Sequence, residues 1–354
     1  MANMPRLWIR HEVRSTERRA PIVPDDARQL VEHGVQITVE ESPQRVYPLD
    51  EYVAAGCATA AAGSWTAAPA DTHILGLKEL PDGPARLTHR HIFFGHAYKG
   101  QDGAGELLGR FAAGGGTLLD LEYLADAAGR RLAAFGYWAG YVGAALAVLH
   151  GRGRLRTPLE PLGKAELDAA LGEPHVAEPP AALVIGALGR CGRGAVDALR
   201  TAGLTPTEWD VAETRQLDRA ALLDHDILLN TVLATRPIPP FLRPADLDDP
   251  RRRLSVVADV TCDVTSDLNV LPVYDAVTDW RQPVRRLREA KPLDLIAIDN
   301  LPSLLPAEAS RAFSAELSPQ LPLLGDDDPA SPWRRCADDF VAACRANDLE
   351  VHHV

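Results

Sequence analysis

Apolar residues in the first third of the chain form short runs, and amphipathic stretches separate these runs. Short apolar runs predict buried strands, and apolar positions that recur every three or four residues predict helices. The pattern predicts strands at residues 7–10, 35–40, 73–78, 92–97 and 117–124, and helices at 25–33 and 105–113. Strands that alternate with helices are typical of α/β proteins with a parallel sheet.

The same alternation returns later in the chain. It predicts strands at 182–185, 207–210, 226–232, 255–260 and 293–298, and helices at 135–150, 193–202, 307–317 and 333–346. The helix at 135–150 is rich in small residues, which allows close packing. The chain is long enough for two domains, and its last amphipathic helix could return to cover the first of them.

Three glycines spaced three apart, Gly186, Gly189 and Gly192, follow the apolar run 182–185. A strand, a tight turn and a helix N-terminus can hold a pyrophosphate through backbone N–H groups and the helix dipole. The spacing differs from the commoner G-x-G-x-x-G, so an ordinary turn is the alternative. Asp210 lies 24 residues after Gly186, where a dinucleotide fold places a carboxylate on the adenosine ribose. A carboxylate there favours NAD, because it would repel the extra phosphate of NADP.

The formal net charge of −12 argues against binding to nucleic acid or to anionic membranes. Residues 1–14 lack an apolar signal core, and no run of about 18 apolar residues predicts a membrane span, so we expect a cytoplasmic protein. The five cysteines show no zinc spacing. Asp259, Asp263, Asp267 and the run 326–328 suit turns and loops, so we expect no metal.

Only four of the 37 basic residues are lysines, and Lys78 follows an apolar strand directly, beside Glu79. His96 ends a second predicted strand. Because strand carboxyl ends face the ligand crevice in open α/β sheets, the two form a candidate acid–base pair. A surface lysine and a structural histidine are the alternatives. The arginine pairs 18–19 and 130–131 both flank the expected crevice, which points to an anionic substrate, and a solvated surface is the alternative.

Nine short blocks are spread over nearly the whole chain, at residues 17–21 with Pro24, 39–44, 76–79, 96–99, 129–131, 134–136, 186–195, 209–210 and 299–306. Together these blocks resemble the saccharopine dehydrogenases of the NAD-dependent, L-lysine-forming type. The first block, residues 17–21 with Pro24, also looks like the start of alanine dehydrogenases and transhydrogenases.

The resemblance implies two Rossmann-like domains with parallel sheets and an interdomain active-site cleft. Residues 1–135 plus 310–354 would form the substrate-side domain, and 136–309 the NAD-binding domain. It implies reversible, NAD-dependent oxidative deamination of saccharopine, a small molecule, to L-lysine and 2-oxoglutarate. It also suggests a monomer.

By motif position, Lys78 and His96 look like the acid–base groups, and Glu79 and Glu122 would moderate their basicity. The residues that would line the substrate site are Arg19, Lys78, Arg131, Phe135, Thr261, Cys262 and Asp263. The residues that would hold the cofactor are Gln101, Arg130, Gly186, Gly189, Arg190, Gly192, Asp210, Thr214, Leu233, Val260, Ile298, Asp299, Asn300 and Leu301.

Three positions depart from the pattern of the family. Thr231 stands where some members carry a second cysteine, Leu233 where an aromatic residue can contact the cofactor, and Asn300 where a histidine is found. These departures leave open a dehydrogenase of another opine or imine-forming amino acid such as alanine. A non-catalytic, nucleotide-responsive binding protein is a further alternative, against which the Lys78 and His96 pair weighs.

Overall fold

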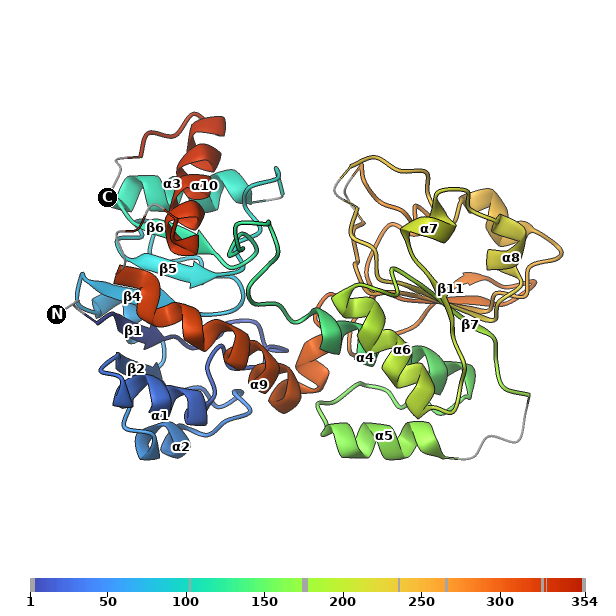
Figure 1. Cartoon of the computed structure of the whole chain (residues 1–354), viewed down its shortest axis with the longest axis horizontal. Helices are drawn as coiled ribbons and strands as arrows, with labels where there is room; N and C mark the ends of the chain where they lie inside the picture. The colour runs from blue at the N-terminus through green and yellow to red at the C-terminus, as the bar shows by residue number, and fades with distance from the viewer. Residues whose placement is uncertain are drawn as a thin grey trace. The chain divides into compact units, whose positions relative to one another are not determined.

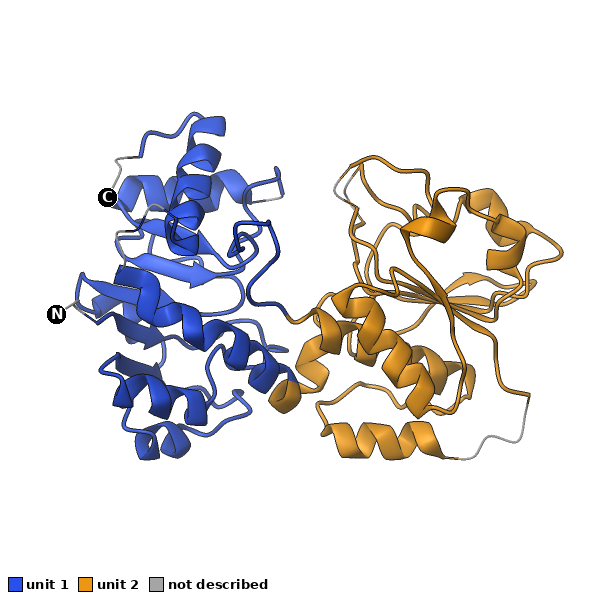
Figure 2. Cartoon of the chain, viewed as in Figure 1, with its two compact units in different colours: residues 1–134, 309–354 blue, residues 135–308 orange. Residues whose placement is uncertain are grey.

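A computed structural model describes residues 4–101, 103–173, 178–234, 236–264, 267–325, 328 and 330–351. The chain divides into two compact units (Figure 2). Unit 1 comprises residues 1–134 and 309–354, and unit 2 is the inserted segment Phe135–Glu308. Within the described ranges, no helix is both long and apolar enough to cross a membrane.

Unit 1 is built on a parallel sheet with the strand order β3-β2-β1-β4-β5-β6. The strands are β1 (Arg6–Ile9), β2 (Gln36–Glu40), β3 (Ala58–Ala60), β4 (Thr72–Leu75), β5 (Arg90–Phe93) and β6 (Thr117–Asp120). The helices are α1 (Pro24–Glu32), α2 (Leu49–Ala54), α3 (Ala104–Gly114), α9 (Pro306–Leu317), which begins in unit 2, and α10 (Pro332–Ala346). Strand order reverses between β1 and β4, the kind of position where open α/β sheets bind ligands at the strand carboxyl ends.

Helix α10 completes the core of unit 1 (Figure 1). Its apolar face packs over β6 and α3, where Phe340 and Cys344 join a cluster with Phe111 and Leu118. Cys336 and Cys344 are fully buried. A buried free thiol behaves as a small hydrophobic group, which explains two cysteines on one amphipathic helix.

Unit 2 has the sheet order β11-β12-β10-β9-β7-β8, parallel except for the edge strand β11. The strands are β7 (Ala182–Ile185), β8 (Thr207–Trp209), β9 (Ile227–Asn230), β10 (Val256–Asp259), β11 (Arg285–Arg288) and β12 (Leu293–Ile296). The helices are α4 (Gly136–Gly151), α5 (Lys164–Gly172), α6 (Arg190–Thr201), α7 (Val211–Thr214) and α8 (Arg219–Leu223). Strand order reverses between β7 and β9, and the glycine loop follows β7 at this position.

Helices α4 and α6 of unit 2 pack at close range (Figure 1). A Cβ atom at Gly140 would lie 1.8 Å from the main-chain oxygen of Cys191, and one at Gly194 would lie 1.9 Å from that of Tyr137. Only glycine fits at either position, because the opposing atoms belong to the backbone. The small residues of α4 therefore serve the contact with α6.

The α/β class and the parallel sheets are as predicted, with differences at the strand ends. The strands predicted at 92–97 and 117–124 end earlier, at Phe93 and Asp120. The Asp120 side chain accepts a hydrogen bond from the amide of Glu122, which turns the chain away from the sheet. Two edge strands, β3 and β11, were not predicted.

Candidate active site

Lys78 lies just past β4, where strand order in unit 1 reverses. Its side chain is 9 % exposed, and its charge acts on the carboxylates of Glu17 and Glu79. Burial raises the pKa of Glu17, but the Arg19 guanidinium, helped by Lys78, holds that pKa below its usual value. Burial also raises the pKa of Glu79, and a hydrogen bond from Arg14 and the charge of Lys78 lower it overall. Lys78 is thus a buried cation with two carboxylates near it, that of Glu17, which is buried, and that of Glu79, which is about half exposed.

His96 follows β5, the neighbour of β4. Its φ of 49° is left-handed, which is uncommon outside glycine and is found in strained functional sites. Its Nδ1 atom lies 3.4 Å from Glu122 Oε2, and Lys99 Nζ lies 3.0 Å from Glu122 Oε1. The hydrogen bond to His96 and the interaction with Lys99 outweigh burial and lower the pKa of Glu122 to about 2. Glu122 therefore stays ionised beside an imidazole that is about half exposed.

Asp120 supports the His96 segment, a role that the sequence did not indicate. Its two carboxylate oxygens accept hydrogen bonds from the amides of Gly95, at 3.2 Å, and Glu122, at 2.9 Å. A Cβ atom at Gly95 would lie 2.6 Å from Leu118 and 3.1 Å from Asp120 Oδ2. Burial is the main reason why the pKa of Asp120 rises to about 6. A charged residue at the buried end of an apolar strand is the signal that could have revealed it.

The two arginines predicted to bind substrate have different surroundings in unit 1. Arg19 is buried and forms a bidentate pair with Glu17, with N–O distances of 2.8 and 2.5 Å. Arg131 packs over the ring of Phe94, at 5.6 Å from the ring centroid. It also lines a cavity of about 470 Å³ together with Glu122.

Gln101 and Arg130, the residues of unit 1 predicted to contact the cofactor, lie on exposed loops. The Gln101 side chain accepts a hydrogen bond of 2.8 Å from the amide of Lys99, which connects it to the Glu122 group. Arg130 is 83 % exposed and pairs with Asp126. Solvent screens such a pair, so the pairing with Asp126 does little to hold Arg130 in place.

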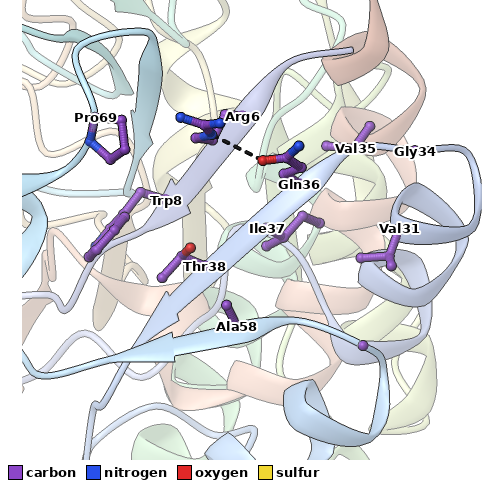
Figure 3. A pocket seen from close by; sticks show the side chains of 11 residues that line it. Arg6, Trp8, Val31, Gly34, Val35, Gln36, Ile37, Thr38, Ala58 and Pro69 are labelled. Carbon is purple, nitrogen blue, oxygen red and sulfur yellow. Dashed lines mark hydrogen bonds between the residues drawn. The ribbon is translucent and has the colours of Figure 1, made fainter.

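A second cavity of unit 1, of about 490 Å³, lies away from these residues (Figure 3). Arg6 and Gln36, which begin β1 and β2, form a hydrogen bond of 3.1 Å in its wall. The cavity therefore borders the amino ends of the strands. None of the predicted site residues lines it, so the larger cavity is not the candidate site.

In unit 2 the glycine loop connects β7 to α6 as a tight turn. Gly186 has a φ of 86°, and a Cβ atom at Gly192 would lie 2.1 Å from the main-chain oxygen of Gly186. Gly189 is the N-cap of α6, so Arg190 begins that helix. Thr231, at the end of β9, donates hydrogen bonds to the main-chain oxygens of Ile185 and Gly186. The loop leaves the amino end of α6 able to accept a pyrophosphate against main-chain N–H groups.

Asp210 follows β8 and lies next to the glycine loop. Its Oδ2 atom accepts a hydrogen bond of 3.0 Å from the amide of Leu188, and its Oδ1 atom accepts one of 2.8 Å from Val211. It is the N-cap of α7, and the Thr214 hydroxyl donates to its main-chain oxygen. The carboxylate is thus fixed beside the loop, where it could accept a hydrogen bond from a ribose hydroxyl.

The remaining predicted residues of unit 2, apart from Phe135, follow β9, β10 and β12. Asp259 is buried and accepts hydrogen bonds from Asn230, Tyr274 and both the amide and the hydroxyl of Thr261. It thereby holds the segment that contains Cys262, whose φ is 52°. The other predicted residues differ in burial. The buried ones are Ile298, Asn300 and Leu301, the half-buried ones are Val260 and Asp263, and the exposed ones are Leu233 and Asp299. Phe135 is the N-cap of α4.

Within the described part of the chain, no group of three or more histidine, cysteine, aspartate or glutamate side chains could hold a metal ion. Asp259 is engaged by the hydrogen bonds given above, which suits a structural role. Asp326 and Asp327 lie outside the described residues.

A solved structure shows which fold this chain shares. A solved L-alanine dehydrogenase superposes with a TM-score of 0.69, covers 98 % of this chain and 100 % of its own, and is 16 % identical, so the two share a fold. Residues 8–142 match the family described as "Alanine dehydrogenase/PNT, N-terminal domain". Two Rossmann-like units with a glycine loop in the second suit a dinucleotide, and the relatives in sequence are NAD(+)-dependent dehydrogenases, so the protein is a nicotinamide-dependent oxidoreductase.

Sequence relatives give the family. An L-lysine-forming, NAD(+)-dependent saccharopine dehydrogenase of Emericella nidulans is 40 % identical over 95 % of this chain and 96 % of its own. The enzyme of the same name from Yarrowia lipolytica is 41 % identical over 93 % of this chain and 95 % of its own. The chain belongs to the family of NAD(+)-dependent, L-lysine-forming saccharopine dehydrogenases, and the resemblance drawn from the motifs is confirmed.

Proposed function

We propose that this protein catalyses the reversible, NAD-dependent oxidation of saccharopine to L-lysine and 2-oxoglutarate, with Lys78 and His96 as the acid–base groups. The observation that supports this proposal best is their arrangement in unit 1. They follow the neighbouring strands β4 and β5, and both have carboxylates beside them. The names of the relatives support the substrate.

The residues of unit 2 fit a dinucleotide, because the glycines let the chain turn tightly from β7 into α6, whose amino end can meet a pyrophosphate. Gly186 and Gly192 would let the phosphates reach the amino end of α6, and Asp210 would bind the ribose. A bound nicotinamide ring supplies the hydride acceptor. Asp210 favours NAD over NADP, since its carboxylate would repel a 2′-phosphate.

Lys78 is proposed to act as the neutral amine and to take the proton from the secondary amine of saccharopine, which leaves Lys78 as the ammonium. Loss of this proton and of the hydride from the neighbouring carbon leaves a carbon–nitrogen double bond. A lysine suits this role better than an arginine, because a guanidinium cannot release its proton near neutral pH. Glu17 and Glu79 would balance the charge of the ammonium that forms.

His96 is proposed to activate the water that attacks the imine carbon. The imidazole takes one proton from water, the hydroxyl adds to carbon, and the resulting carbinolamine then breaks its carbon–nitrogen bond. As water adds, the Lys78 ammonium returns its proton to the nitrogen. The His96 imidazolium then protonates the nitrogen, which leaves as L-lysine, while the hydroxyl gives its proton back to the imidazole and becomes the carbonyl of 2-oxoglutarate. Glu122 stabilises the imidazolium, because its low pKa keeps it ionised throughout the working range.

Arg19 and Arg131 are proposed to bind carboxylates of the substrate. Saccharopine carries three carboxylates, and a guanidinium binds a carboxylate through two parallel hydrogen bonds. Arg131 is suited to this role because it lines a cavity together with Glu122. Arg19 is already paired with Glu17, which would fix its orientation.

The decisive experiment replaces Lys78 by methionine and measures turnover and NADH binding separately. General acid–base catalysis contributes roughly 10² to 10⁴ in rate, so Lys78→Met should lower kcat by at least about 100-fold and leave the Kd for NADH unchanged. Lys291→Met is the matched control, because the Lys291 ammonium donates to the main-chain oxygen of Pro250 in unit 2, outside the proposed acid–base group. Full turnover by Lys78→Met would exclude Lys78 from the mechanism.

The amine partner is tested by oxidation of NADH with 2-oxoglutarate and one of three amines. We expect turnover with L-lysine and much less with ornithine or alanine. Turnover that needs no diamine would support a dehydrogenase of another opine or amino acid instead.

A further inference from the structure

Arg10 and Glu12 form a buried ion pair at the carboxyl end of β1. Arg10 is 1 % exposed and Glu12 is 5 % exposed, and Arg10 Nη1 lies 3.3 Å from Glu12 Oε2. Removing two charges from water is costly, and a buried pair often stabilises a fold no better than apolar side chains would. The place of this pair in the fold therefore calls for an explanation other than stability.

The pair binds the main chain on both sides of Lys78. Glu12 Oε1 accepts a hydrogen bond of 2.7 Å from the amide of Leu77, and Glu12 Oε2 accepts one of 3.1 Å from the amide of Lys78. Arg10 Nη2 donates to the main-chain oxygen of Lys78. Both polar main-chain groups of Lys78 are thus bound by charged side chains, although Lys78 lies beyond the end of β4. Hydrogen bonds to charged groups are stronger and better oriented than neutral ones.

The surrounding residues leave room for the Arg10 guanidinium and little else. A Cβ atom at Gly76 would lie 2.4 Å from Arg10 Nε and 2.5 Å from Arg10 Cζ. On the other side, Arg10 Cζ lies 5.6 Å from the centroid of the Phe93 ring. The backbone of Gly76 does not have a positive φ, so the reason for glycine at this position is space.

We infer that Arg10 and Glu12 are positioning residues that aim the Lys78 amino group at the substrate amine. The inference rests on the proposed role of Lys78. A lysine side chain has four rotatable carbon–carbon bonds, so catalysis with it depends on a fixed starting point. The ion pair supplies that fixed point at the main chain, at the place where strand order reverses.

The first test compares Glu12→Gln with Glu40→Gln. Both glutamates are buried. Glu12 accepts hydrogen bonds from two main-chain amides, and Glu40 accepts them from three, those of His11 at 2.7 Å, Gly63 at 2.9 Å and Trp65 at 2.6 Å. Glutamine presents a donor where one amide needs an acceptor, so both variants should lose unfolding stability. A misplacement of about 1 Å can cost about 100-fold in rate, so kcat should fall by about that factor in Glu12→Gln only. The Kd for NADH should stay unchanged in both variants.

A second pair of variants decides the question if Glu12→Gln does not fold. Arg10→Lys keeps the charge and loses the fork that reaches both Glu12 and the oxygen of Lys78. Arg252→Lys is its control, because Arg252 is also 1 % exposed and donates to main-chain oxygens, in unit 2. We expect kcat to fall at least 10-fold in Arg10→Lys and less than twofold in Arg252→Lys.

The pH profile separates positioning from general stability. The limb of the kcat profile that disappears in Lys78→Met should shift in Glu12→Gln or Arg10→Lys, and it should keep its place in the controls. Equal losses of kcat in the test and control variants, or an unshifted limb, would overturn the inference and leave the role of Lys78 intact. Normal turnover by Lys78→Met would instead overturn the proposed function.

Discussion

Asp210 offers a test of the cofactor site in which stability and binding can be separated. Its two carboxylate oxygens accept hydrogen bonds from Leu188 in the glycine loop and from Val211 at the start of α7. Asp210→Ala removes both. Asp210→Asn removes the charge and keeps an oxygen for the cap, since asparagine is as good an N-cap as aspartate.

The expected magnitudes follow from these contacts. Loss of an N-cap costs about 1 kcal/mol, and loss of a hydrogen bond to a charged group costs about 1.5 to 3 kcal/mol. Asp210→Ala should therefore lower the free energy of unfolding by roughly 2 to 4 kcal/mol, and Asp210→Asn by less. A carboxylate and a doubly charged phosphate about 5 Å apart in water repel each other by about 1.7 kcal/mol. Asp210→Asn should therefore bind NADPH about 10- to 20-fold more tightly than the unchanged protein does.

The assay is titration of NADH and NADPH by fluorescence, together with urea unfolding. The matched control is Asp218→Asn, because the Asp218 side chain caps α8 through the amide of Ala221 and lies in the same unit. It should leave the ratio of the two Kd values unchanged. An NADPH affinity that changes less than twofold in Asp210→Asn would refute the placement of the ribose at this carboxylate.

Three further predictions concern stability. Gly140→Ala places a Cβ atom 1.8 Å from the main-chain oxygen of Cys191, so urea unfolding should show that the free energy of unfolding falls by at least about 1 to 3 kcal/mol. Gly109→Ala is the control and should be neutral or stabilising, because no atom lies within 4 Å of a Cβ atom there. Burial holds the pKa of His91 well below its usual value, so protonation favours the unfolded chain as pH falls below about 6.5. His91→Phe should therefore remove about 1.4 kcal/mol per pH unit from the acid dependence of the free energy of unfolding. An unchanged slope of that free energy between pH 7 and 5 would contradict the prediction. Asp120 acts with the opposite sign, because burial raises its pKa to about 6. Its contribution to the free energy of unfolding therefore rises as pH falls from about 6 to 4. Asp120→Asn should remove about 3 kcal/mol of that rise, as measured by unfolding at both pH values.

The sequence predicted the sheets because buried parallel strands are nearly continuous apolar runs. β4 and β7 are buried at every position, and both were found. β11 reads Arg-Arg-Leu-Arg and was missed, because an antiparallel edge strand does not need an apolar run. β3 was missed because three residues of alanine and threonine carry too weak a pattern.

The candidate site could be predicted only where a residue type stands out at a strand end. Lys78 and His96 could be located this way, since each follows an apolar run. Asp120 carried such a signal, a charged residue at the buried end of an apolar strand, but its role was not predicted. The pair Arg10 and Glu12 could not be predicted, because its contacts with the main chain of Leu77 and Lys78 join residues more than sixty positions apart, and one sequence contains no record of them.

The interruption of unit 1 by unit 2 has a consequence for synthesis on the ribosome. A growing chain contains all strands of unit 1 after residue 120, but α10, which covers β6 and α3, is made last. The apolar surface around Phe111 and Leu118 must wait for it, while unit 2 can fold first. The nascent protein thus carries an unfinished sheet of unit 1 through most of its translation, and chaperones that bind apolar segments would meet it there.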